Sequence, residues 1–144
     1  MKKVLMRVLL IAVSLAAVAF SGCVSEPKQT MKFNEFEAYR SFNAQVSGVY
    51  VTDIVDGKAV RFTIEDGDVM TEIINYYLNA EFKYGGDGRY VGCNSVMHFV
   101  YETGNELSVN LGSIYENGRS YLYNDGSMQD LVKEIERSNL AQEQ

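Results

Sequence analysis

The chain has 144 residues, of which 13 are basic and 19 acidic, and 47% are hydrophobic. This length allows one domain with a modest core. The acidic balance argues against nucleic acid as a partner, because phosphates are bound through Lys and Arg side chains.

The first element is a positively charged start followed by an apolar run. The basic residues Lys2, Lys3 and Arg7 precede an apolar stretch of 13 residues, from Val8 to Phe20. That is the length of the hydrophobic region of a signal peptide, and it is too short to span a bilayer. Residues 1–22 are therefore expected to be an export signal and not a transmembrane helix.

The export signal ends in Phe20-Ser21-Gly22-Cys23, with small residues directly before a cysteine. This resembles the lipobox of bacterial lipoproteins, in which that cysteine carries acyl chains such as palmitate and becomes the first residue of the mature protein. The resemblance implies lipid attachment at Cys23 and a place in the cell envelope, on the extracytoplasmic side of a membrane. Val24 is not the aspartate that retains a lipoprotein at the inner membrane, so the outer membrane is favoured in a Gram-negative cell.

The chain as a whole resembles the small, uncharacterised lipoproteins of bacteria, which carry a short tether and one compact α+β domain. Cleavage before Cys23 would leave 122 residues with a net charge of about −9, because all 19 acidic residues remain and three basic ones are lost. Such a surface is not drawn to anionic lipid, so attachment would depend on the acyl chains, at about 0.8 kcal/mol per buried methylene.

Cys93 would then be the one unmodified cysteine of the exported chain. A thiol in an oxidising compartment is either buried or reactive, and we expect a small buried apolar residue here. If Cys23 carried no lipid, a disulfide between the two cysteines would become an alternative, although a tether is a poor site for one.

The domain is expected at residues 33–138, after a polar tether at residues 23–32 and before a frayed tail at residues 139–144. Phe33, Phe36, Tyr39 and Phe42 recur every three residues, which favours a short amphipathic helix that covers part of the core. The alternative is that these aromatic residues still belong to the tether.

Two β-rich runs at residues 49–55 and 59–64 follow, separated by Asp56-Gly57. Asp-Gly between such runs favours a two-residue type I′ turn, in which both central residues have positive φ. The pattern predicts a hairpin whose second strand directs Val60, Phe62 and Ile64 to the core and its other side to solvent.

Apolar residues at helical spacing then predict a helix over residues 69–82, with Asp66 or Asp68 as its N-terminal cap. The glycine-rich segment 84–92 is expected to form a mobile loop. Because loops on a rigid scaffold often carry binding, we expect Tyr84, Arg89 and Tyr90 to form the partner contact.

Three short strands are predicted at residues 95–102, 106–111 and 120–123, followed by a helix that starts at a Ser127/Asp130 capping box. The order of elements is hairpin, helix, three-strand meander and helix. It predicts an α+β domain with an antiparallel sheet of about five strands and helices packed on one face.

Candidates for chemistry are few. His98, the single histidine, lies in a strand whose two faces could each be the core, and it is expected to be structural. A hydrolytic pair of Cys93 and His98 would need hydrogen-bond contact, and no hydrolase or phosphate-loop motif is present. The sequence therefore predicts no enzymatic activity, no resident metal and no cofactor.

The leading expectation is a non-enzymatic binding or accessory module with an envelope protein as its partner, which it contacts through the face of the sheet or through the 84–92 loop. A surface rich in tyrosine suits a protein or a glycan. The alternative is a lipoprotein that binds Ca²⁺ or a small ligand. Its carboxylates would come from the acidic end of the hairpin: Asp53, Asp56, Glu65, Asp66 and Asp68.

Overall fold

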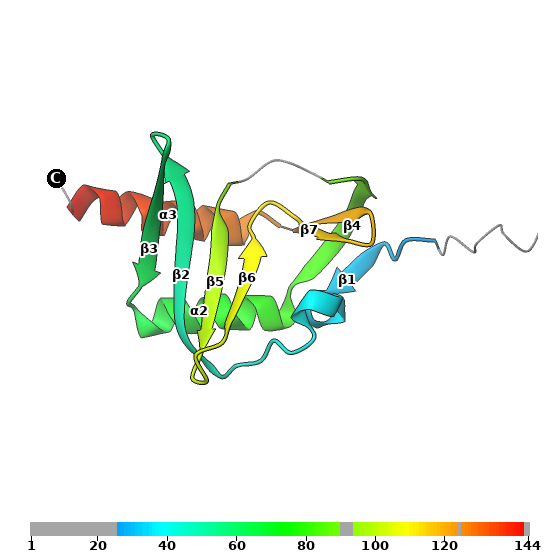
Figure 1. The fold of residues 1–144 in the computed structure, drawn as a ribbon, viewed down its shortest axis with the longest axis horizontal. Helices are drawn as coiled ribbons and strands as arrows, with labels where there is room; N and C mark the ends of the chain where they lie inside the picture. Colours follow the sequence, from blue (N-terminus) through cyan, green and yellow to red (C-terminus); the bar gives the residue numbers. More distant parts are fainter. Residues whose placement is uncertain (1–25, 90–93, 124, 143–144) are drawn as a thin grey trace, which may run out of the picture.

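The computed structural model describes residues 26–89, 94–123 and 125–142, with side chains up to residue 137. It is an α+β fold in which two antiparallel sheets of four strands each and two α-helices surround one core (Figure 1). Sheet A has the strand order β1-β4-β8-β7, and sheet B has the order β3-β2-β5-β6. The elements are β1 (Thr30–Lys32), the 3-10 turns η1 (Phe33–Glu35) and η2 (Glu37–Tyr39), β2 (Val46–Val55), β3 (Lys58–Ile64), α2 (Gly67–Asn79), β4 (Glu81–Asp87), β5 (Val96–Tyr101), β6 (Glu106–Asn110), β7 (Ile114–Glu116), β8 (Arg119–Tyr123) and α3 (Ser127–Gln142).

The predicted hairpin is confirmed as β2 and β3. Asp56 and Gly57 have φ angles of 51° and 75°, the positive values that a type I′ turn needs. The two strands pair without a register shift from the turn to the far end of β3, where Val49 lies opposite Ile64. Phe62 and Ile64 are buried and Arg61 is exposed, so the two faces of the hairpin also lie as predicted.

The prediction of one sheet of about five strands is wrong. The chain leaves sheet B after β6, because the Asn110 side-chain oxygen accepts hydrogen bonds from the backbone N–H groups of Gly112 and Ser113 at 2.7 and 3.2 Å. This turn redirects the chain into β7 and β8. Strand β7 pairs with β8, and β8 pairs with β4, so these strands do not extend the β5-β6 pair as a meander.

Residues 81–87, which cover the expected end of the helix and the start of the expected mobile loop, form a strand instead. Helix α2 ends at Asn79, because Ala80 adopts an extended backbone, and residues 81–87 form β4 between β1 and β8. The glycines serve the strand: the register shifts between Tyr84 and Gly86, and a Cβ atom on Gly85 would lie 2.8 Å from Cγ of Leu122. Residues 90–93 of the expected loop lie outside the described residues.

The N-terminal part of the domain also differs from the prediction. Residues 30–32, which were expected in the tether, form β1 and pair with β4. The aromatic spacing of residues 33–42 corresponds to two 3-10 turns and not to one α-helix. The expected covering of the core is confirmed, since Phe33, Phe36 and Phe42 are all buried there.

An aspartate just before each α-helix accepts hydrogen bonds from its first turn. Asp66 caps α2, as predicted, because its carboxylate accepts hydrogen bonds from the backbone of Asp68 at 2.8 Å and of Val69 at 3.2 Å. At α3 the predicted capping box is replaced by Asp125, whose carboxylate accepts hydrogen bonds from the hydroxyl of Ser127 at 2.5 Å and from its backbone N–H at 3.0 Å. These two hydrogen bonds lower the pKa of Asp125.

A chain of buried hydroxyl groups joins the parts of the core. The hydroxyls of Tyr77 on α2 and Tyr123 on β8 lie 2.7 Å apart, and the Tyr123 hydroxyl lies 3.0 Å from the carbonyl oxygen of Asn110 at the end of β6. Burial raises the pKa of both phenols well above the usual range. One helix and both sheets are therefore connected at a single point.

We predict that Tyr77→Phe lowers the free energy of unfolding by about 1–2 kcal/mol, because the buried Tyr123 hydroxyl loses a partner. Chemical denaturation monitored by circular dichroism measures this. Tyr115→Phe, at a ring that is 44% exposed, is the matched control and should change stability by less than about 0.5 kcal/mol. Equal effects of the two substitutions would contradict the proposed link.

Candidate functional site: the outer face of sheet B

Sheet B has one face toward the core and one toward solvent. Helix α2 packs against β2 and β3, helix α3 packs against β3, and both lie behind the sheet in the view of Figure 1. The opposite face, called here the outer face, carries alternate residues of the four strands, which the pairing register places side by side. Its central members are Tyr50 and Thr52 of β2, Arg61 and Thr63 of β3, Val96, His98 and Val100 of β5, and Glu106 and Ser108 of β6.

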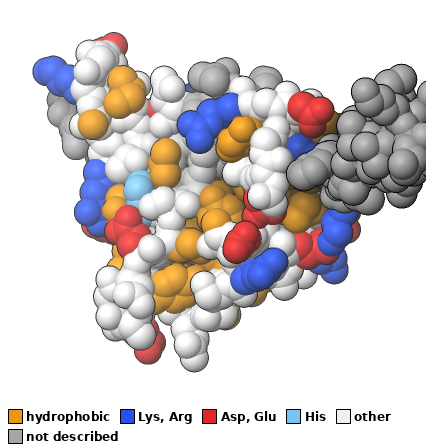
Figure 2. All heavy atoms as spheres, turned by 45° about the vertical axis from the view of Figure 1, so that its right-hand side comes forward, with side chains coloured by type: hydrophobic (Ala, Val, Ile, Leu, Met, Phe, Trp, Pro, Cys, Tyr) orange, Lys and Arg blue, Asp and Glu red, His pale blue; other side chains and the backbone are white. Residues whose placement is uncertain are grey.

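Three of these side chains form a stack across three strands. Tyr50 lies directly opposite His98 in the ladder, and their rings are parallel within 4° with centroids 4.3 Å apart. The guanidinium carbon of Arg61 lies 3.6 Å from the centroid of the Tyr50 ring, a cation–π contact. Figure 2 shows the histidine in pale blue at the surface, with basic and acidic side chains beside it.

Hydrogen bonds fix this stack to the neighbouring strands. One Glu106 carboxylate oxygen lies 2.8 Å from Nδ1 of His98, and the other accepts a hydrogen bond of 2.9 Å from the Tyr50 hydroxyl. Thr52 Oγ1 lies 2.9 Å from Nε2 of the imidazole, and Ser108 Oγ lies 2.9 Å from Nδ1. Both nitrogens of the imidazole and both oxygens of the carboxylate therefore have partners.

The electrostatics follow from these contacts. The hydrogen bond with His98, followed by that from Tyr50, lowers the pKa of Glu106, so this carboxylate is ionised at neutral pH. The pKa of the Tyr50 phenol is raised, first by burial and then by its hydrogen bond to Glu106. The His98 side chain is 15% exposed and the Glu106 side chain 41% exposed, so the cluster lies at the surface.

Thr52, His98 and Glu106 form a hydroxyl–imidazole–carboxylate chain, the order of groups that activates a hydroxyl nucleophile in hydrolases. Acyl transfer also needs donors aimed at the developing oxyanion. Strands β2 and β5 each have a paired strand on both sides, so their backbone N–H groups are used in the ladder and are not available as oxyanion donors. The arrangement holds these side chains in place across β2, β5 and β6.

The expected contact residues do not join this site. Tyr84 lies in β4, where its hydroxyl donates to Asp87 at 2.9 Å and its ring packs 6.0 Å from that of Tyr121. Arg89 lies over the ring of Tyr115, with its guanidinium carbon 5.0 Å from the centroid. Both belong to the region of sheet A, and Tyr90 lies outside the described residues.

The acidic residues expected to bind calcium are also separated. Asp56 lies at the hairpin turn, whereas Asp66 and Asp68 lie beyond the opposite end of β3. Within residues 26–89, 94–123 and 125–142, no group of three or more His, Cys, Asp or Glu side chains is placed to hold a metal ion. Cys23 and Cys93 both lie outside these ranges, so lipid attachment and the state of the second thiol stay predictions.

No model of a known protein family matches the chain, and no curated protein or solved structure is significantly similar to it. Among the helices in the described part of the chain, none combines the length and apolar character needed to cross a membrane. The functional argument therefore depends on the geometry of the site and on the N-terminal sequence.

We predict that Glu106→Gln lowers the pKa of the Tyr50 phenol, because a neutral amide no longer opposes ionisation of the adjacent phenol. The contribution of burial should persist, so the shift is partial. An alkaline titration of the chain with ¹³Cζ-labelled tyrosine, followed by NMR, measures it. Glu102→Gln, at an exposed carboxylate in the next turn, should leave Tyr50 unchanged, and an unchanged Tyr50 in Glu106→Gln would refute the contact.

Proposed function

We propose that this chain is a lipid-anchored, extracytoplasmic protein of the bacterial envelope, and that it is a non-enzymatic module that binds a partner protein through the outer face of sheet B. The observation that carries the proposal is the Arg61–Tyr50–His98 stack, bound by Glu106, on a face opposite both helices. The cluster is not needed to form the hydrophobic core, because its side chains lie on the opposite face of the sheet.

The composition and rigidity of the cluster support protein recognition. Tyrosine and arginine are the side chains most often responsible for binding energy at protein interfaces. Here both are held before a partner arrives, which reduces the entropy lost on binding. Ile54, on the same face of β2, is 52% exposed and offers apolar surface beside the polar cluster.

The position of the outer face relative to the N-terminus also supports the proposal. The first described residues lead into β1 at the edge of sheet A, and sheet B lies at the other end of the domain (Figure 1). A chain anchored through Cys23 would therefore hold sheet A nearer to its point of attachment. The outer face of sheet B would stay accessible to a partner in the envelope.

Site-specific photo-crosslinking in bacteria tests the interface. A photoreactive residue at Thr63, exposed on the outer face, should give a discrete crosslinked adduct, whereas the same residue at Glu72, exposed on α2, should not. Tyr50→Ala should weaken binding by about 2 kcal/mol, or about 30-fold, and remove the adduct. Adducts from both positions, or adducts that persist in Tyr50→Ala, would refute this assignment.

The anchor is tested by intact mass and membrane fractionation of the full chain and of Cys23→Ala. The wild-type chain should begin at Cys23, carry added acyl mass and sediment with membranes, because two or more acyl chains give stable attachment. The variant should lose the acyl mass and leave the membrane fraction. A wild-type chain of unmodified mass in the soluble fraction would contradict the lipoprotein assignment.

A further inference from the structure

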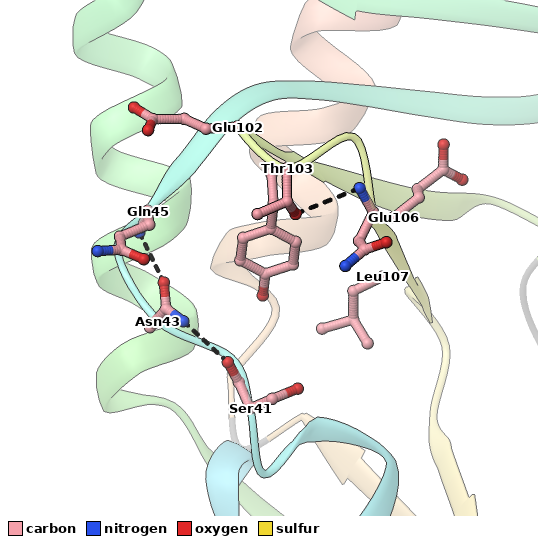
Figure 3. A pocket seen from close by; sticks show the side chains of 9 residues that line it. Ser41, Asn43, Gln45, Glu102, Thr103, Glu106 and Leu107 are labelled. Atoms are coloured by element: carbon pink, nitrogen blue, oxygen red, sulfur yellow. Dashed lines mark hydrogen bonds between the residues drawn. The ribbon is translucent and has the colours of Figure 1, made fainter.

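A pocket of about 300 Å³ lies at the end of sheet B, between the segment that precedes β2 and the β5-β6 turn (Figure 3). Side chains of residues 41–45 form one wall, and residues 101–107 form the other. Its volume is at the lower end of the range of about 300–1,000 Å³ that is usual for ligand sites. The pocket is separate from the Arg61–Tyr50–His98 stack, none of whose three residues lines it.

The pocket has an apolar floor and a polar rim. The floor is contributed by Tyr101 and Leu107, both partly buried against the core. The Tyr101 hydroxyl oxygen is itself buried, so the ring offers mainly carbon surface to the pocket. The rim carries the amides of Asn43, Gln45 and Asn105 and the hydroxyls of Ser41 and Thr103.

The charges of the lining residues indicate which class of ligand fits the pocket. Two carboxylates, Glu102 and Glu106, lie among the nine lining residues, and none of the nine is Lys or Arg. A phosphate or carboxylate ligand would meet repulsion with no compensating cation. The site therefore favours a ligand without negative charge.

Local hydrogen bonds keep both walls in place. The Asn43 side chain donates to the carbonyl of Ser41 at 3.0 Å and accepts from the backbone of Gln45 at 2.8 Å, two of the bonds drawn in Figure 3. In the opposite wall, the Tyr101 backbone N–H donates to Asn105 at 2.9 Å and the Gly104 N–H donates to Tyr101 at 2.8 Å. The Gln45 and Asn105 side chains therefore extend from backbone segments that local hydrogen bonds hold in place.

We propose that this pocket binds one unit of a neutral saccharide. A pyranose ring presents C–H groups on its face and hydroxyls around its edge, which matches an aromatic and aliphatic floor inside a rim of amides and hydroxyls. Amide side chains donate and accept at once, as vicinal hydroxyls require. The two apolar floor residues supply the contact that excludes water from the ring face.

Saturation-transfer NMR on the full chain, solubilised in a detergent that contains no sugar, tests the proposal. The probes are chitotriose and maltotriose as neutral saccharides, butylammonium as a cation and inorganic phosphate as an anion. We expect one of the saccharides to bind with a Kd of about 1 mM or lower. Phosphate should not compete with the bound saccharide.

Three variants locate the binding. Gln45→Ala/Asn105→Ala should weaken it about tenfold or more through the loss of two hydrogen-bonding amides, and Ser41→Phe should abolish it by filling the pocket. Asn75→Ala, on the exposed surface of α2, is the matched control and should bind as wild type. Ser41 and the two amide side chains are all exposed, so near-ultraviolet circular dichroism should confirm that each variant is folded.

The proposal is overturned if neither saccharide transfers saturation at 10 mM to the folded wild-type chain, a concentration about tenfold above the expected Kd. It is equally overturned if saccharide binding is the same in Ser41→Phe, which would place the sugar elsewhere. Binding of butylammonium in place of both saccharides would likewise overturn the proposal, because the pocket would then select a cation.

Discussion

The structure depends on one aromatic core shared by two sheets. Phe33 and Tyr77 lie with ring centroids 4.8 Å apart, Phe82 and Tyr123 at 4.9 Å, and Phe42 and Phe99 at 4.9 Å, so rings from the N-terminal turns, α2 and both sheets contact one another. The Tyr77–Tyr123 hydrogen bond fixes this contact at its centre. Both helices pack on the core side of sheet B, so in the described part of the chain neither helix covers its outer face.

The uncovered side is ordered by its own side chains. The stack of Arg61, Tyr50 and His98 needs strands β3, β2 and β5 in one register, and Glu106 ties it to β6. Glu106 is also one of the residues that line the pocket at the end of the sheet, so the two surfaces share a residue. Both oxygens of the Glu106 carboxylate are held by the stack on the outer face.

Local features of this fold could be predicted from sequence, and pairing between distant segments could not. The Asp56-Gly57 turn determines the β2-β3 register by itself, and the apolar spacing of Ile73, Ile74 and Tyr77 identifies the buried face of α2. Strand β4 was missed because Gly85-Gly86 marks a bulge as readily as a loop. The cluster was missed because Thr52 and His98, 46 residues apart, meet only through the β2-β5 register, which no short pattern encodes. Of its members, the sequence identifies Arg61 as facing solvent and His98 as the single histidine, and the pattern of residues 95–102 fits either face of that strand as the core.

The central claim, that the outer face of sheet B is occupied by a partner in the envelope, is tested most directly by thiol labelling in intact cells. In a Cys93→Ser background, Thr63→Cys and Glu72→Cys chains would be exposed to a membrane-impermeant maleimide, in cells and after purification. The account predicts equal labelling rates in the purified proteins and slower labelling of Thr63→Cys alone in cells. Equal rates in cells would contradict it, because the face would then be free where the protein functions.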